Sequence, residues 1–538
     1  MKKLLYLFAI VFTFSCTIKT EVDLIVTNAN IYTVNNSFEK AEAFAVKDGK
    51  FLDIGSSKEI MEQYNAAESL DAQGQTIVPG FIDAHCHFVG LGFNQQQVNL
   101  VGTTSYDEVV KRVVEFQKKN NLDYIKGRGW DQNDWEVKEF PTKEKLDALF
   151  PDTPIALTRI DGHAILCNQA ALDLGNVSVD SKIDGGEVVL ADGKLTGVLI
   201  DNAETLVLKH WPKPSKDDLI NAIKAAQDVC FDYGLTTVND AGLSIDAINT
   251  IDSLQQTGAL KIRVYAMVST SKENLDYYLD NGVYKTDRLN VRSFKFYADG
   301  ALGSRGAMLR EPYSDKPNHY GLMVNDIKTL QKTAKRIANS DFQMNTHAIG
   351  DSANHVVLQT YKSVLKDKKD RRWKVEHAQI ISGEDFDLFD DIIPSVQPTH
   401  ATSDMYWAED RVGPHRIKGA YAYKQLLDKY GKIALGTDFP VEHVSTFYTF
   451  YAAVARQDLE HYPEEGFQIE NALSRAETLK GMTIWAAYSN FEEDEKGSIE
   501  IGKFADFIIL DKDIMTTDIN NIPNLKVVNT FVSGENVK

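Results

Sequence analysis

The chain has 538 residues, of which 43% are hydrophobic, and it carries a formal net charge of −19. This length supports a large core and more than one domain. The strong negative charge excludes a nucleic-acid binder, because the phosphate backbone would be repelled.

The first segment, residues 1–15, has the pattern of a bacterial lipoprotein signal peptide. Two lysines precede an apolar run that is too short to span a bilayer comfortably. Ser15 then precedes Cys16, at which cleavage and lipidation are expected, although Thr13 stands where this signal usually has leucine. The alternative is an ordinary secretory signal with an incidental Cys16. We expect an exported lipoprotein, anchored on the periplasmic or cell-surface side of a membrane that it does not cross.

Both ends of the mature chain have a sequence pattern typical of short β-strands. Residues 16–79 contain short alternating strands, and Asp48-Gly49 between two apolar runs is a hairpin signal. Residues 491–538 have the same pattern of short strands. We therefore predict one small β-sandwich domain built from both termini, with a large domain between them.

Residues 80–490 alternate helical stretches with short apolar runs that end in polar residues. The clearest predicted helices are 215–234, 329–341 and 423–431. This alternation is typical of βα-repeats, and its length predicts an α/β fold with a TIM-like (β/α)₈ barrel. An insert covering about 95–205 interrupts the barrel, and residues 185–200 within it read as a hairpin.

Two histidines follow the first apolar run of this region, in the stretch "VPGFIDAHCHFVGLG". Side chains along a strand alternate between its two faces, so His85 and His87 share one face and could bind one metal ion. Cys86 faces the other way and reads as a core residue. This pair alone could also be two ordinary polar residues where a strand enters a loop.

Further polar residues follow or lie within other apolar runs: Asp240, Lys295, His347, His377, His400 and Asp438. In a (β/α)₈ barrel, the strand ends carry the active site. Imidazole and carboxylate ligands suit Zn²⁺ and similar divalent ions. Such an ion lowers the pKa of water and supplies hydroxide, and a neighbouring aspartate can move a proton. The set predicts a metal-dependent hydrolase.

Longer motifs resemble the amidohydrolase superfamily: "PGFIDAHCH", "THAIGD", "EHAQ", "GTDFPV" and "GSIEIGKFADFIILD". Others resemble amidohydrolase family 3, whose members include N-substituted formamide deformylase: "RGWDQNDW", "RIDGHAILCNQAAL", "KFYADGALGSRGA" and "SVQPTHATSD". The resemblance covers nearly the whole mature chain. It implies a metal-dependent TIM-like barrel with a β-sandwich made from both termini.

The resemblance also implies the metal ligands. His85, His87 and Asp438 are expected to bind a first ion, and His347 and His377 a second. The metal is expected to be zinc, as one or two ions.

Lys295 is expected to bridge the two ions as a carbamate, since the resemblance places it between them. The alternative is an unmodified lysine beside a single ion. Asp438 is expected to act also as the proton shuttle. It follows Thr437, where the family often has serine, and that change keeps a hydroxyl group.

Other residues are candidates for the substrate pocket. Trp130 and His163 in the insert are expected to contact substrate, with a structural role as the alternative. Arg305 is expected to bind a substrate carboxylate or carbonyl, or else to form an internal salt bridge. His400 is expected to polarise a substrate carbonyl, with Asp404 nearby.

These observations together predict hydrolysis of a C–N bond in an amide-like small molecule, such as an N-acyl or N-formyl compound, by metal-activated hydroxide. One alternative is hydrolysis of an ester or a cyclic amide on the same scaffold. Another is a non-catalytic nutrient-binding lipoprotein. The expected partners are a small-molecule substrate and, through the lipid anchor, a membrane. A homodimer remains open.

Overall fold

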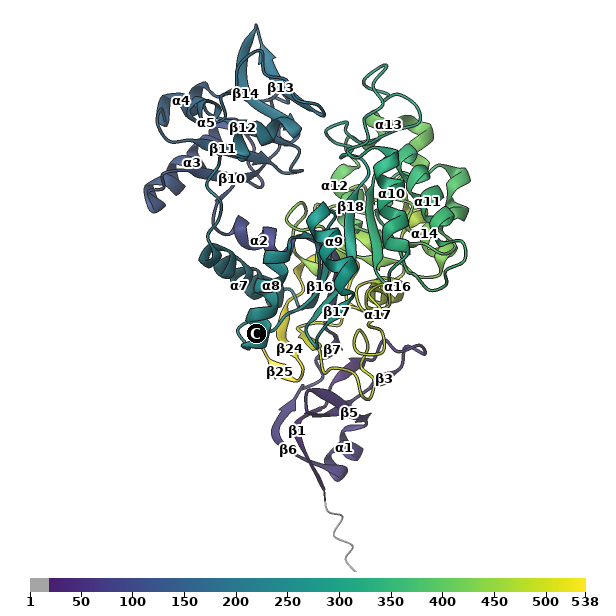
Figure 1. Cartoon of the computed structure of the whole chain (residues 1–538). Coiled ribbons are helices and arrows are strands. Elements are labelled where there is room, and N and C mark those ends of the chain that lie inside the picture. Colours follow the sequence, from purple (N-terminus) through teal and green to yellow (C-terminus); the bar gives the residue numbers. More distant parts are fainter. Residues whose placement is uncertain (1–18) are drawn as a thin grey trace, which may run out of the picture.

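The computed structural model describes residues 19–538, and the middle of the chain forms a barrel of eight parallel strands (Figure 1). These strands are β8 (Phe81–Cys86), β15 (Leu235–Leu243), β16 (Arg263–Ser269), β18 (Leu289–Tyr297), β19 (Gln343–Ala348), β20 (Lys374–His377), β21 (Ile393–Val396) and β22 (Ala434–Leu435). The chain after β22 returns to β8, where the Asp438 N–H donates to the His85 carbonyl at 2.8 Å. This near-closed barrel confirms the predicted fold class.

Helices cover the outside of the barrel, as βα-repeats require. They include α2 (Phe88–Asn94), α7 (Lys216–Asp232), α8 (Ile245–Gln256), α9 (Lys272–Asn281), α10 (Ile327–Ala338), α11 (Asp351–Leu365), α12 (Pro398–Asp404), α13 (Ala408–Arg416), α14 (Tyr423–Tyr430), α15 (Thr446–Ala455), α16 (Arg475–Gly481) and α17 (Ile484–Ser489). Ser215 and Asp218 form a capping box that starts α7. The three helices predicted from the sequence correspond to α7, α10 and α14.

A β-sandwich built from both termini packs against one end of the barrel (Figure 1). One sheet contains β1 (Thr20–Thr27), β4 (Ala43–Lys47), β5 (Lys50–Gly55) and β6 (Tyr64–Asp71). The other contains β2 (Asn30–Tyr32), β3 (Lys40–Ala41), β7 (Thr76–Pro79), β23 (Phe507–Leu510), β24 (Val527–Val532) and β25 (Glu535–Asn536). Asp48 and Gly49 have φ values of 50° and 74°, the left-handed conformation that a two-residue hairpin needs.

The sandwich core joins the two ends of the chain. Phe44 of one sheet packs edge-on against Phe507 of the other, with ring centroids 4.9 Å apart. Phe51 contacts Phe44 with centroids 5.1 Å apart. These buried aromatic side chains fix the C-terminal strands to the N-terminal ones.

The insert is a separate layer with its own sheet and core at the other end of the barrel (Figure 1). Its strands are β9 (Val98–Asn99), β10 (Ile125–Trp130), β11 (Ile155–Arg159), β12 (Ala164–Cys167), β13 (Gly186–Ala191) and β14 (Lys194–Asp201). Its α-helices are α3 (Tyr106–Asn120), α4 (Glu144–Leu149), α5 (Gln169–Leu174) and α6 (Thr205–Leu208). The hairpin predicted at 185–200 is β13 and β14, which pair antiparallel.

The predicted signal peptide and Cys16 lie outside the described residues. Among the helices of residues 19–538, none combines the length and the apolar character that crossing a membrane requires.

Candidate functional site

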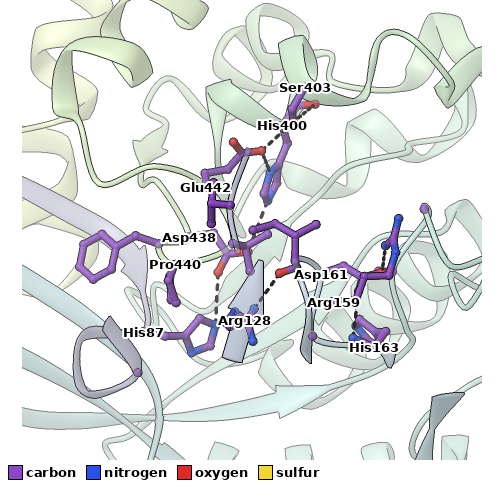
Figure 2. A pocket seen from close by; sticks show the side chains of 18 of the residues that line it. His87, Arg128, Arg159, Asp161, His163, His400, Ser403, Asp438, Pro440 and Glu442 are labelled. Carbon is purple, nitrogen blue, oxygen red and sulfur yellow. Dashed lines mark hydrogen bonds and ion pairs between the residues drawn. The ribbon is translucent and has the colours of Figure 1, made fainter. Parts of the chain in front are cut away.

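A cavity of about 1180 Å³ lies over the C-terminal ends of the barrel strands, and the insert forms part of its wall. Its barrel lining includes His87, Lys295, His347, His377, His400 and Asp438. Figure 2 shows Asp438 between His87 and His400, with Arg128 and His163 of the insert facing the same space. The residues that the sequence placed at separate strand ends therefore meet in one cavity.

His85 and His87 lie on the same side of β8 and approach one carboxylate oxygen. Nε2 of His87 lies 3.2 Å from Oδ1 of Asp438, and Nε2 of His85 lies 3.6 Å from the same oxygen. Nδ1 of His87 is 3.1 Å from the Ala241 carbonyl, which leaves Nε2 free. Cys86 is buried in the core, as alternation along the strand requires. His85, His87 and Asp438 form one group of potential metal ligands.

A second group of potential ligands consists of His377, His400 and Asp438. Nε2 of His400 lies 3.3 Å from Oδ2 of Asp438. His347 stands beside His377, with ring centroids 4.6 Å apart, but it is outside this group. Burial is the main cause that holds the pKa of both His347 and His377 well below the usual histidine value. Both rings are therefore neutral and have a lone pair for a cation.

Lys295 is fully buried near the end of β18, against the first histidine. Its Nζ lies 2.9 Å from Nε2 of His85. Within residues 19–538, no carboxylate oxygen comes within 4.0 Å of this nitrogen. Burial lowers the pKa of Lys295 to about 8, although Glu376 and Asp438 oppose the shift. The neutral amine is therefore a larger fraction of this side chain at neutral pH than for an exposed lysine, although the ammonium still predominates.

Two buried side chains orient these histidines, and the sequence analysis assigned neither. Oε2 of Glu376 lies 2.5 Å from Nδ1 of His85, and Oε1 of Gln397 lies 2.8 Å from Nδ1 of His377. Each contact turns Nε2 of its ring toward the cavity, the role that outer partners play for metal-binding histidines. The sequence does contain a signal that could have identified Glu376. This residue lies next to His377 in an apolar run, where a buried carboxylate needs a partner.

Another buried carboxylate, that of Asp299, lies next to His347. Its Oδ1 lies 3.7 Å from Nε2 of that ring. The same carboxylate accepts the N–H groups of Met308, Ile349 and Gly350 at 2.8, 3.0 and 2.8 Å. Asp299 therefore ties the loop after β18 to the loop after β19 and fixes the position of His347.

This set of donors fits a divalent cation. Oδ1 of Asp438 and Nε2 of His347 are buried and make no hydrogen bond to any described residue. Burial raises the pKa of Asp438, but the neighbouring His400 and His87 side chains outweigh it and hold the pKa well below the usual range. A carboxylate anion and several neutral imidazoles converge, which is the ligand chemistry that zinc and similar ions prefer.

Glu376→Gln is expected to weaken metal affinity by about 10- to 100-fold, because Gln cannot supply the charge that orients His85. The measurement is competition for zinc against a chelator of known affinity, with thermal unfolding as a check of the fold. The matched control is Glu384→Gln, which removes an exposed partner of Arg310. Equal zinc affinity in Glu376→Gln and the wild type would contradict this role.

Two predicted substrate contacts are corrected by the structure. Trp130 is fully buried in the core of the insert, its Nε1 donates to the Leu157 carbonyl at 2.7 Å, and it does not line the cavity. Arg305 also lies off the cavity, because Asp315 binds its Nη2 at 2.7 Å and its Nε at 3.1 Å. Both residues have the structural role that was the alternative reading.

His163 and His400 do line the cavity. His163 pairs through Nδ1 with Asp201 at 2.8 Å. His400 lies between Asp438 and Glu442, whose Oε1 is 2.9 Å from its Nδ1 (Figure 2). Burial alone would lower the pKa of His400, but hydrogen bonds to these two carboxylates raise it well above the usual value. His400 is therefore a cation.

Other acidic residues near the site hold backbone or neighbouring groups. Asp240 accepts the Val89 N–H at 3.0 Å. Asp404 lines the cavity and accepts the Tyr421 hydroxyl at 2.7 Å. Burial raises the pKa of Asp240 to about 6 and that of Asp404 to about 7.

The insert also contributes charged side chains that the sequence analysis did not assign. Arg128, Arg159 and Asp161 line the same cavity as the histidines (Figure 2). The motif "RGWDQNDW" contains Arg128 directly before the glycine, but only the tertiary structure turns the arginine rather than the tryptophan toward the cavity.

Comparison with known proteins agrees with this geometry. A family model described as "Amidohydrolase family" matches residues 68–538. The putative amidohydrolase YtcJ of Bacillus subtilis is 31% identical over 517 residues, which cover 94% of this chain and 97% of YtcJ. The N-substituted formamide deformylase of Arthrobacter pascens is 25% identical, and the match covers 95% of this chain and 97% of that protein.

A solved structure also matches over nearly the whole chain. The crystal structure of an uncharacterized metal-dependent hydrolase from Pyrococcus horikoshii superposes with a TM-score of 0.76 at 28% sequence identity. The match covers 92% of this chain and 99% of that one.

Proposed function

The chain belongs to the amidohydrolase family, and from this we propose that it hydrolyses a C–N bond in an amide-like small molecule. N-acyl and N-formyl amines are the proposed substrates. The observation that carries the proposal is the convergence of His85, His87 and His377 on one carboxylate, Asp438, at the cavity. The name of the deformylase relative supports the bond type for that protein, and we extend it to this chain as part of the proposal.

The residues that would hold a divalent ion are His85, His87, His347, His377, Lys295 and Asp438, with zinc as the proposed metal. An ion bound by these residues would supply a Lewis acid for the scissile carbonyl and lower the pKa of a water molecule to near 7. The protein itself positions the histidine rings through Glu376 and Gln397.

Asp438 has the position of the proton carrier in this proposal. Its carboxylate faces the cavity, and His87 and His400 approach its two oxygens at 3.2 and 3.3 Å. A carboxylate in this place accepts a proton from the attacking water and returns it to the leaving nitrogen. The cationic His400 beside it places a positive charge near the substrate carbonyl oxygen, where negative charge develops.

A substrate screen combined with metal analysis tests this function. Purified protein loaded with zinc is expected to bind about one to two ions and to release amine from N-formyl or N-acyl amines. Chelation is expected to abolish turnover, and added zinc to restore it. Matched esters and cyclic amides belong in the same screen. If only the esters or cyclic amides are hydrolysed, the proposed bond type is wrong. If the protein binds no metal and hydrolyses none of the compounds, a binding lipoprotein is favoured.

We also propose that the protein is exported and anchored through lipid on Cys16, as the signal pattern of the first residues suggests. Cys16→Ser is expected to release the protein from the membrane fraction or to block its processing, because stable anchoring needs acyl chains. Cell fractionation with mass spectrometry of the N-terminus measures this. A processed Cys16→Ser protein that stays with the membrane would contradict the anchor.

A further inference from the structure

Arg128 is a cation of the cavity wall that forms no salt bridge with any described residue. Its Nη2 donates to the Ile160 carbonyl at 2.8 Å, and its Nε is buried without a hydrogen-bond partner in the described chain. No carboxylate of residues 19–538 lies within 4.0 Å of this guanidinium. A guanidinium has five N–H donors and matches the two oxygens of a carboxylate. Arg128 therefore presents unused donors to the cavity that it lines.

The neighbouring acidic residues are already bound to another arginine. Arg159 pairs with Asp131 and Asp161, the latter at 2.6 Å. Asp161 also accepts the His163 N–H at 3.0 Å. These carboxylates therefore form salt bridges with Arg159, whereas Arg128 forms none within residues 19–538.

A further carboxyl group near Arg128, that of Glu204, is mostly neutral. Burial raises the pKa of Glu204 to about 8, so that this group is mostly protonated at neutral pH. Glu204 therefore does not supply a full negative charge to Arg128.

Arg128 lines the same cavity as Asp438. Figure 2 shows its guanidinium between His87 and Asp161. Burial lowers the pKa of Arg128, and the charges of Asp161 and Asp438 oppose that shift. Apolar side chains line the same cavity, among them Leu91, Val101, Leu302 and Trp407. The cavity thus combines potential metal ligands, apolar side chains and a guanidinium.

We propose that Arg128 binds a carboxylate of the substrate and so determines specificity. The substrate class is then an N-acyl or N-formyl amine that carries a carboxylate and an apolar side chain on its amine part. This inference rests on the proposed function, because the scissile bond is assigned to the centre around Asp438. Arg128 anchors one end of the substrate, and this contact sets which amide carbonyl reaches that centre.

Matched probes test the anchor. The probes are both enantiomers of N-acetylleucine and N-acetylphenylalanine, each paired with its carboxamide, which lacks the negative charge. On zinc-loaded wild-type protein, at least one carboxylate probe is expected to be preferred over its carboxamide by about 10- to 100-fold. The readout is kcat/KM for probes that are hydrolysed and Kd from calorimetry for those that are not.

Arg128→Gln is expected to abolish this preference, and Arg128→Lys to keep a part of it, because lysine retains the charge but not the two-pronged geometry. The matched control is Lys126→Gln, which removes a positive charge from the same strand at a residue that does not line the cavity. It is expected to leave the preference unchanged. Thermal unfolding of each variant checks the fold.

The outcomes separate the two proposals. A carboxylate preference that depends on Arg128 without any hydrolysis supports the anchor and contradicts the proposed function. Hydrolysis with equal preference for charged and neutral probes supports the function and overturns the anchor. A preference that persists in Arg128→Gln means that the carboxylate binds the metal ions, and it also overturns the anchor. So does the absence of binding by every carboxylate probe to the wild type.

Discussion

Asp438→Asn is expected to lower the turnover of an amide substrate by about 100-fold or more, while the protein keeps part of its metal. Asparagine preserves the shape of the side chain but cannot accept a proton. One amide oxygen remains as a potential metal ligand. In the wild type, Nε2 of His85 and Nε2 of His87 lie 3.6 and 3.2 Å from Oδ1 of Asp438. The measurement is kcat of metal-loaded protein, with zinc content determined on the same sample.

The control for this variant is Asp240→Asn. Asp240 is a buried carboxylate on the neighbouring strand β15, it holds the Val89 N–H, and it belongs to neither group of potential ligands. Its replacement is expected to lower thermal stability more than turnover. Near-normal kcat of Asp438→Asn at full metal occupancy would show that another group carries the proton.

Lys295→Ala is expected to lose most of the activity, about 100-fold or more, because a ligand that stabilises the reaction centre is removed. The buried amine has no carboxylate partner in the described chain, and its lowered pKa makes the neutral form more accessible than in an exposed lysine. A neutral amine can add CO₂ to form a carbamate, an anion whose two oxygens can bind metal. Added formate or acetate is therefore expected to restore part of the activity by occupying the vacated space.

Carboxylation of Lys295 has a direct structural readout. A crystal of zinc-loaded protein grown with bicarbonate is expected to show electron density for three additional atoms on Nζ of Lys295. A bare amine in a fully metallated crystal would refute the carbamate and leave a centre of histidines and Asp438.

A second buried lysine provides the control for the rescue. Lys374 lies in the same barrel, donates to Oδ1 of Asn490 at 2.8 Å, and has a pKa that burial lowers to about 8. Lys374→Met is expected to lower stability, and formate is expected to restore none of its lost activity. Rescue of both variants would show that the added anion acts without occupying the Lys295 site.

The sequence by itself determined the features that depend on local patterns. Alternation along β8 placed His85 and His87 on one face, and Asp48-Gly49 set the hairpin between β4 and β5. The helical stretches and the apolar runs between them predicted the barrel. Because parallel strands of a barrel end at one rim, residues far apart in sequence, such as Lys295 and Asp438, could be expected in one cavity.

Only the tertiary structure decided which side chains support the histidines and which face the substrate. Glu376 reaches His85 across 291 positions of sequence, a contact that no local pattern encodes. Trp130 and Arg128 lie two positions apart on one strand, where regular alternation would put them on one face. A register shift between them, at Gly129 with a φ of 114°, separates them, so that the core of the insert encloses the indole while the guanidinium lines the cavity. The physical reason is that local periodicity fixes the face of a side chain only in a regular strand. Irregularities, and what covers each face, are set by packing between elements that are distant in the chain.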